Sequence, residues 1–147
     1  MILPYNSVVL VADGRKMLLL RNMGDAQYPQ LEVMNAAQQP VRYDRDMKRD
    51  APGRAFASVG GSRSAMEETD FQQQEEDRFA ADAAAMLERM AMEGEYDRLI
   101  VVAPPRTLGE LRKHYHREVT DRLKGEIAKD LTGHPVGAIS RIIAEMD

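Results

Sequence analysis

The chain has no cysteine among its 147 residues. This absence excludes disulfide bonds, thiolate nucleophiles and thiolate metal sites. Long apolar runs are missing too: the first one, Val8–Ala12, is too short for a signal peptide or a membrane span, and no basic segment precedes it. We therefore expect a cytoplasmic protein without membrane contacts.

The chain also has fewer basic than acidic residues. Twenty Lys and Arg residues face 24 Asp and Glu residues, which gives a formal net charge of -4. Bulk, sequence-independent binding of nucleic acid needs a basic protein, so it is excluded for the molecule as a whole. A local basic patch stays open. The remaining composition, with 44% hydrophobic and 30% charged residues, is typical of one soluble globular domain spanning residues 1–147.

The first third of the chain has the pattern of strands. The run "VVLVA" is apolar and β-branched throughout, which predicts a strand buried on both faces. Asp13-Gly14 predicts a hairpin turn, after which "MLLLRN" returns as a second strand. The stretch "LEVMN" predicts a third strand at a sheet edge, with Leu31 and Val33 facing inward.

A long helix is expected next. Asp70 is a suitable N-cap and Gly94 a suitable residue just past the C-terminus. Between them, one core-facing stripe comprises Phe79, Ala83, Met86, Leu87 and Met90.

The last third alternates between strands and helices. "DRLIVVAPP" predicts a central buried strand, and Thr107 with Glu110 predicts a capping box that opens a helix. A turn is expected near Glu118–Arg122, followed by a strand over Leu123–Lys129. Pro135 should be the first residue of a final helix, whose inner face comprises Val136, Ile139, Ile142 and Ile143.

The expected order is β-β-β, long loop, α-β-α-β-α. Strands that alternate with helices require parallel neighbours and right-handed crossovers. We therefore predict an α/β fold with a five-stranded mixed sheet. An antiparallel meander of three strands is joined by two parallel strands, and helices lie on the faces of the sheet.

A long stretch without periodicity, at about residues 36–70, is predicted to be a loop. It is locally basic and contains the pair Gly60-Gly61. Loops of this length are usually functional or disordered, and a solvated loop of mixed charge stays an alternative. If it is functional, the glycines either form a turn that only glycine can make or let another molecule approach the backbone. We expect this loop to be mobile from about Arg42 to Ser64 because it has few apolar anchors.

Arg106 and Thr107 form a second candidate site. They follow the central strand, at the edge of an α/β sheet where ligands tend to bind and at a helix N-terminus that favours anions. A solvated arginine after two prolines is the alternative interpretation. His114 and His116 are two residues apart, so they do not share one face of a helix, and we predict neither a metal site nor a cofactor.

Four stretches carry a resemblance to a known family. They are "VVLVADGRKMLLLRN", "APGRAFASVGGSRSAMEETD", "DRLIVVAPPRTLGELRKHYHREV" and "GEIAKDLTGHP". Together they resemble the bacterial host-attachment protein family over nearly the whole chain. That family is similar to the middle domain of eukaryotic and archaeal peptide-chain release factors, which has the same expected order of strands and helices.

The resemblance implies a function for the diglycine. The release-factor middle domain carries a Gly-Gly-Gln tip that enters the ribosomal peptidyl-transferase centre, and Gly60 and Gly61 fall at the corresponding place. By this resemblance, Arg54 and Arg63 would contact phosphates of the ribosome, tRNA or rRNA. Ser62 stands where the glutamine is expected, which puts peptidyl-tRNA hydrolysis in doubt and leaves open whether the chain is an enzyme. The family's link to host attachment would then be indirect.

Two further functions stay open at this point. In the first, the chain is a non-enzymatic interaction or regulatory module with a protein partner. In the second it is a small hydrolase, whose site lies at the carboxyl edge of the sheet around Arg106 and near the end of the first strand.

Overall fold

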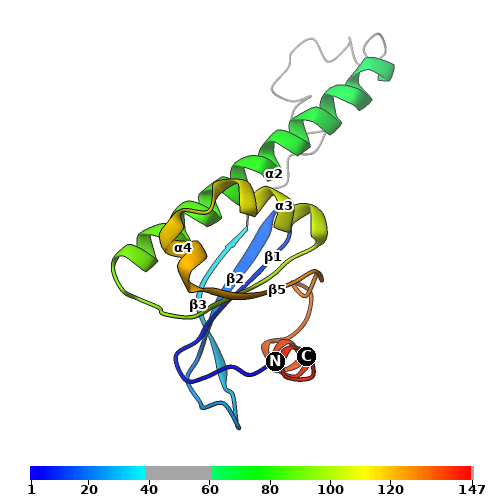
Figure 1. The fold of residues 1–147 in the computed structure, drawn as a ribbon. Coiled ribbons are helices and arrows are strands. Elements are labelled where there is room, and N and C mark those ends of the chain that lie inside the picture. Colours follow the sequence, from blue (N-terminus) through cyan, green and yellow to red (C-terminus); the bar gives the residue numbers. More distant parts are fainter. Residues whose placement is uncertain (39–60, 147) are drawn as a thin grey trace.

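The computed structural model describes residues 1–38 and 61–146, and the side chains of residues 1–37 and 71–146. It consists of one mixed sheet with helices on both faces and one helix that extends well beyond the sheet (Figure 1). The strands are β1 (Val8–Ala12), β2 (Lys16–Asn22), β3 (Leu31–Gln38), β4 (Leu99–Val102) and β5 (Leu123–Ile127). The helices are α2 (Gly61–Met92), α3 (Pro105–His114), α4 (Arg117–Arg122) and α5 (Val136–Ala144).

The sheet has the strand order β3-β2-β1-β4-β5. β1 pairs with β2, and β2 with β3, in antiparallel orientation, whereas β4 runs parallel to both β1 and β5. The predicted fold class is therefore confirmed. Because β1, β4 and β5 are parallel, their carboxyl ends lie at one edge of the sheet.

The sequence of β1 explains the two-sided core. All five of its residues are buried, and alternate side chains point to opposite faces. Val8 and Leu10 pack against α2, α3 and α4 on one face, while Val9 and Val11 pack against α5 on the other. A continuous apolar run is what a strand needs when helices cover both sides of it.

The stripe predicted for the long helix is confirmed. Ala83, Met86, Leu87 and Met90 are buried, with Phe79 packed beside them, and Gly94 has a φ of 71° just past the helix end. In the last helix, Ile139 and Ile143 are buried, with Val136 and Ile142 packed against the same core.

The predicted start of the long helix was wrong. α2 begins at Gly61, so Asp70 lies within it and is not its N-cap. β3 also extends to Gln38, which leaves residues 39–60 between the two elements, outside the described residues. The mobility predicted for Arg42 to Ser64 falls mostly on this stretch. Residues 61–70 show no apolar periodicity, and periodicity reports burial in a core and not helix formation itself.

Three smaller predictions also need correction. α3 begins at Pro105, so Thr107 lies inside it and forms no capping box; a proline at the first position presets φ and lacks an N–H that would be unpaired there anyway. The turn expected at Glu118–Arg122 is the short helix α4, capped by His116, whose Nδ1 accepts a hydrogen bond from the Glu118 N–H at 3.1 Å. Pro135 is the N-cap of α5 and not its first residue.

β3 lies at the sheet edge as predicted, but Val33 does not face the core. Val33 is 51% exposed, and a bulge interrupts the register between the pairs Leu19–Asn35 and Leu20–Val33. Because an edge strand has a neighbour on one side alone, its side chains are less covered than those of β1.

Candidate nucleic-acid interface

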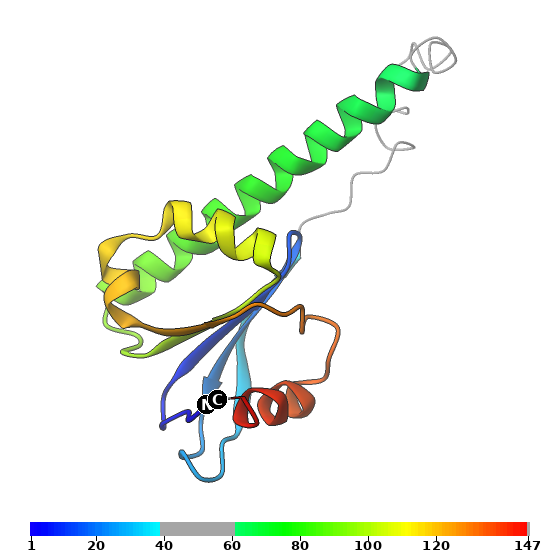
Figure 2. The ribbon, with the colours of Figure 1, turned by 45° about the vertical axis from the view of Figure 1, so that its right-hand side comes forward.

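The amino-terminal half of α2 extends past the sheet (Figures 1 and 2). It contacts the turn between β1 and β2 at Glu76, whose side chain lies against Gly14. Fifteen residues separate Glu76 from Gly61, and a helix rises 1.5 Å per residue, so the helix start lies about 22 Å beyond this contact. We call Gly61–Glu75 the projecting segment.

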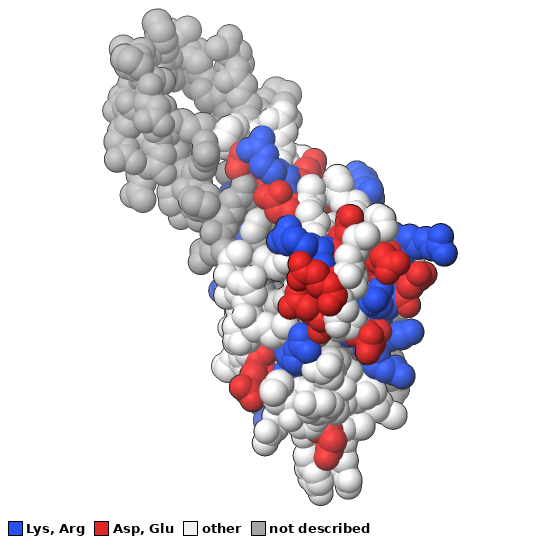
Figure 3. Space-filling model, turned by 90° about the vertical axis from the view of Figure 1, so that its left-hand side faces the viewer, with Lys and Arg blue, Asp and Glu red and all other residues white. Residues whose placement is uncertain are grey.

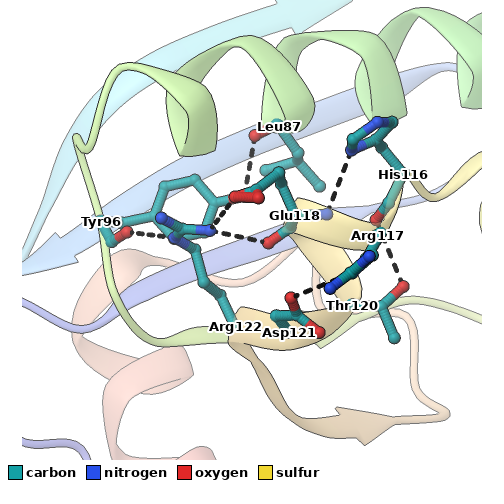
Figure 4. A network of polar contacts seen from close by, with 8 residues as sticks. All are labelled: Leu87, Tyr96, His116, Arg117, Glu118, Thr120, Asp121 and Arg122. Carbon is teal, nitrogen blue, oxygen red and sulfur yellow. Dashed lines mark hydrogen bonds and ion pairs between the residues drawn. The ribbon is translucent and has the colours of Figure 1, made fainter.

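The other end of α2 is held firmly by the body of the protein. Figure 4 shows Tyr96 beneath the last turns of the helix, with its hydroxyl donating a 2.8 Å hydrogen bond to the Leu87 carbonyl oxygen. Arg122 of α4 donates from Nε to the Tyr96 carbonyl oxygen at 2.9 Å. Its Nη1 lies 3.0 Å from both the carbonyl oxygen and a carboxylate oxygen of Glu118.

The side chain of Tyr96 is 1% exposed. Burial raises the pKa of its hydroxyl to about 12, although the nearby Arg122 cation acts in the opposite direction. The phenol therefore stays protonated and continues to donate its hydrogen bond at neutral pH. This contact, together with the apolar stripe, makes α2 a rigid support for the projecting segment.

The structure describes the predicted tip residues only in part. Arg54 and Gly60 lie outside the described residues. Gly61, Ser62 and Arg63 are the first three residues of α2, and their side chains are not described. Gly61 therefore belongs to a helix start and not to the middle of a long loop. The first N–H groups of a helix lack partners within it, so this end favours an anion or a carbonyl oxygen.

Charge is distributed unevenly along this part of the chain. α2 contains eight acidic and three basic residues, and Arg63 is the one basic residue between Gly61 and Asp77. By contrast, the sequence of residues 39–60 contains five basic and three acidic residues. The acidic helix thus begins directly after a stretch of net positive charge.

Most cations on the helices of the body are neutralised locally. Figure 3 shows acidic and basic side chains close together over one side of the molecule. Ion pairs join Arg78 to Glu75, Arg112 to Glu126, Lys113 to Glu110, Arg117 to Asp121 and Arg122 to Glu118. This surface therefore offers little net positive charge to a polyanion.

The second predicted site lies apart from the tip. Arg106 is exposed and Thr107 half-buried in the first turn of α3, directly after the carboxyl end of β4. Both views place this helix start beside the body, away from the amino-terminal end of α2 (Figures 1 and 2). The two predicted sites are therefore not one pocket.

Sequence reasoning missed a contact at the same edge of the sheet. The Thr132 hydroxyl lies 2.6 Å from Oδ1 of Asp130 and 3.1 Å from Oδ2 of Asp13. Oδ1 of Asp13 also accepts hydrogen bonds from the backbone N–H groups of Arg15 and Lys16, both at 2.7 Å. The loop after β5 is thereby tied to the turn after β1. Thr132 and Asp13 are 119 residues apart, so no local pattern indicates the contact.

The described ranges contain neither a membrane-spanning helix nor a metal cluster. Within residues 1–38 and 61–146, no helix combines the length and apolar character of a membrane span. In the same ranges no three His, Asp or Glu side chains gather in a way that would hold a metal ion.

A comparison with known families agrees with this order of elements and with the long helix after residues 39–60. The sequence model of bacterial archaeo-eukaryotic release factor family 12 matches residues 6–143. The chain belongs to this family. Membership confirms the resemblance to the release-factor middle domain, and it is a finding about the family and not about the activity of this chain.

Among solved structures, an archaeal translation termination factor, aRF1, is similar to the chain. The two share 13% sequence identity with a TM-score of 0.47, and the similarity covers 84% of this chain. This chain spans only 30% of the termination factor. None of the curated proteins matches the chain.

Proposed function

We propose that this protein is a translation-related factor that contacts ribosomal RNA or tRNA through the diglycine Gly60-Gly61 and the residues beside it. The observation that carries the proposal is the projecting segment of α2, which starts about 22 Å beyond its contact at Glu76 and begins at Gly61. Membership in the release-factor-like family supports an association with translation.

Charge supports a nucleic-acid partner for the tip. Arg54 and Arg63 flank the diglycine in an otherwise acidic protein. A glycine pair lets the backbone approach a ligand closely, and the first N–H groups of a helix favour phosphate or carbonyl oxygens. We assign these groups to contacts with RNA phosphates, while the cytoplasm is the compartment in which such a factor would work.

We assign a role in RNA binding to the tip and do not assign peptidyl-tRNA hydrolysis to it. Ser62 stands where the resemblance expects a glutamine, so the longer carboxamide side chain is missing. Backbone N–H groups alone would still stabilise a developing oxyanion. A role in attachment to host cells would follow indirectly from an effect on translation.

Co-sedimentation with ribosomes tests this function. Purified protein and ribosomes are centrifuged at low salt, and the variant Gly60→Leu/Gly61→Leu is compared with Gly109→Leu/Gly137→Leu. The control adds the same two side chains at helical glycines where a Cβ has no neighbour within 4 Å. We expect wild type and the control to sediment with ribosomes and the tip variant to stay in the supernatant. If wild type does not sediment, the proposed function is wrong.

One observation favours a second candidate, a protein-interaction module. Ile2, Tyr5, Met23 and Tyr28 are exposed, with Ile2 at 74% and Tyr28 at 71%. They lie in the amino-terminal segment and the loop between β2 and β3, at the end of the molecule opposite the projecting segment (Figure 1). This candidate predicts that wild type captures a protein partner in a pull-down, that Tyr5→Ser/Tyr28→Ser loses this partner, and that the diglycine variant retains it.

The hydrolase alternative stays a prediction. It is tested by the loss of esterase or phosphoesterase activity in Arg106→Ala at unchanged thermal stability. Protein that shows no such activity before substitution would rule this alternative out.

A further inference from the structure

Four basic residues lie at the edge of the sheet from which α2 projects. Arg15 belongs to the turn between β1 and β2, and Lys16 is the first residue of β2. Arg106 lies in the first turn of α3, and Lys129 in the loop after β5. We call these four residues the cationic edge. They come from three separate parts of the sequence, and the fold brings them to one end of the sheet.

The strand register fixes this arrangement. Val11 of β1 is level with Val102 of β4, which is level with Ile127 of β5. Lys129 follows Ile127 by two residues, and Arg106 follows Val102 by four residues. Lys16 begins β2, beside the end of β1. Neighbouring strands are about 4.8 Å apart, so the four strands from β2 to β5 span roughly 14 Å. The cations therefore lie along one short row.

The four residues of the cationic edge lack carboxylate partners within the described structure. The basic side chains Arg78, Arg112, Lys113, Arg117 and Arg122 all have ion pairs. None of the four edge residues has an ion pair with any residue that the structure describes. Arg106 and Lys129 are exposed, and Arg15 and Lys16 are half-buried.

Three acidic residues lie near the same edge and limit its net charge. Oδ1 of Asp13 accepts hydrogen bonds from two backbone N–H groups, and its Oδ2 lies 3.1 Å from the Thr132 hydroxyl. Asp130 accepts hydrogen bonds from the N–H and the hydroxyl of Thr132. Glu76 lies against Gly14. These carboxylates are engaged in local contacts, whereas the four cations are not paired with carboxylates of the described residues.

We propose that the cationic edge is a second RNA-binding surface, which holds the phosphate backbone at the foot of the projecting segment. This inference rests on the proposed function and adds a specific set of residues to it. One strand of nucleic acid carries a phosphate every few ångströms, so a row of about 14 Å meets several successive phosphates. The edge would fix the position of the protein on RNA while the tip makes its own contact further out.

A matched pair of triple variants tests this surface. The edge variant is Arg15→Gln/Arg106→Gln/Lys129→Gln. The control is Arg98→Gln/Lys124→Gln/Arg141→Gln. It also removes two arginines and one lysine, from exposed positions before β4, at the start of β5 and on α5. None of the control residues has an ion pair within the described structure, so both variants change the net charge equally.

The measurement is the dissociation constant for purified ribosomes as a function of KCl concentration. Each lost phosphate contact lowers the magnitude of the slope of log K against log salt by about 0.7–0.9, so the loss of three contacts in the edge variant should lower it by about 2–3. We expect it to bind roughly tenfold or more weakly than wild type at physiological salt, and the control to stay within about threefold. Thermal melting of both variants checks that the fold is intact.

The outcomes separate the two proposals. If the edge and control variants bind equally well, the cationic edge is not an RNA surface, although the tip proposal survives. If wild type shows no binding to ribosomes at low salt, both proposals are wrong. If the edge variant loses affinity with an unchanged salt slope, the lost contact is not with phosphate and the inference is overturned.

Discussion

Gly14 lies so close to Glu76 that a Cβ on the glycine would be 2.8 Å from both Cγ and Cδ of the glutamate. The contact places the turn between β1 and β2 directly against α2, at the point where the helix leaves the body. A side chain at residue 14 would force the glutamate, or the turn itself, to move. The missing side chain at residue 14 thus lets Glu76 pack directly against the turn.

A double-mutant cycle tests this contact. Gly14→Ala should destabilise the protein by about 1 kcal/mol, because the new methyl group meets the glutamate side chain. In a Glu76→Ala background the same substitution should cost less than about 0.5 kcal/mol, since the opposing atoms are gone. Urea unfolding of the four proteins measures both values. Equal costs in the two backgrounds would show that the contact does not constrain the turn.

Because of Tyr96, we expect the free energy of unfolding to fall at alkaline pH. Burial raises the pKa of this phenol from 10.0 to about 12, so the folded protein holds the proton where the unfolded chain releases it. The stabilisation is complete below pH 10 and is lost as the pH rises toward about 12. Chemical denaturation at a series of pH values, with phenolate absorbance as a second signal, follows both events together.

Tyr96→Phe should make this alkaline fall shallower, while losing about 1 kcal/mol at neutral pH with the hydrogen bond to Leu87. Part of the fall should remain, because burial also raises the pKa of Tyr115. Tyr28→Phe, at an exposed position, is the control and should leave the profile unchanged. A Tyr96→Phe profile identical to that of wild type would refute this assignment.

Asn22 should be among the most sensitive polar residues. It is fully buried, and its amide donates to Leu3 at 2.7 Å and Asp25 at 3.2 Å while its oxygen accepts from Gly24 at 2.9 Å and Gln30 at 2.8 Å. Asn22→Ala leaves several buried backbone groups unpaired, so we expect a loss of roughly 2–4 kcal/mol.

The matched control is the exposed Asn35 on β3. Asn35→Ala should cost less than about 1 kcal/mol, since its side chain bonds the adjacent Ala36 N–H at the surface. Thermal and urea unfolding of both variants give the comparison. Similar losses at the two positions would mean that Asn22 does not organise the amino-terminal segment and the loop after β2.

The sheet could be predicted from sequence because burial leaves a direct pattern. Val8–Ala12 and Leu99–Val102 are apolar throughout, and the structure buries both strands completely. Asp13-Gly14 marked the hairpin because the Asp13 carboxylate accepts hydrogen bonds from the N–H groups of Arg15 and Lys16 in the turn, and Gly94 marked the end of α2 because its φ is 71°. The predictions agree with the structure where local backbone preferences and burial in the core favour the same conformation.

The remaining features lack such a local signal. Residues 61–70 form a helix without an apolar stripe, so the start of α2 was misplaced by ten residues. α4 is capped by the histidine His116, which is not among the usual capping residues. The contact between Asp13 and Thr132, and the gathering of the cationic edge, depend on strand order and register.

A single introduced thiol gives the most direct test of the central claim, that the start of α2 touches RNA. Because the chain has no cysteine, Ser62→Cys provides one unique site for a photo-crosslinker, and Met92→Cys provides a control at the other end of the same helix, at a position that is 63% exposed. Each labelled protein is irradiated with ribosomes, and the crosslinked material is analysed. We expect crosslinks to RNA from residue 62 and none from residue 92. Crosslinks from residue 62 to protein alone, or equal RNA crosslinks from both positions, would contradict it.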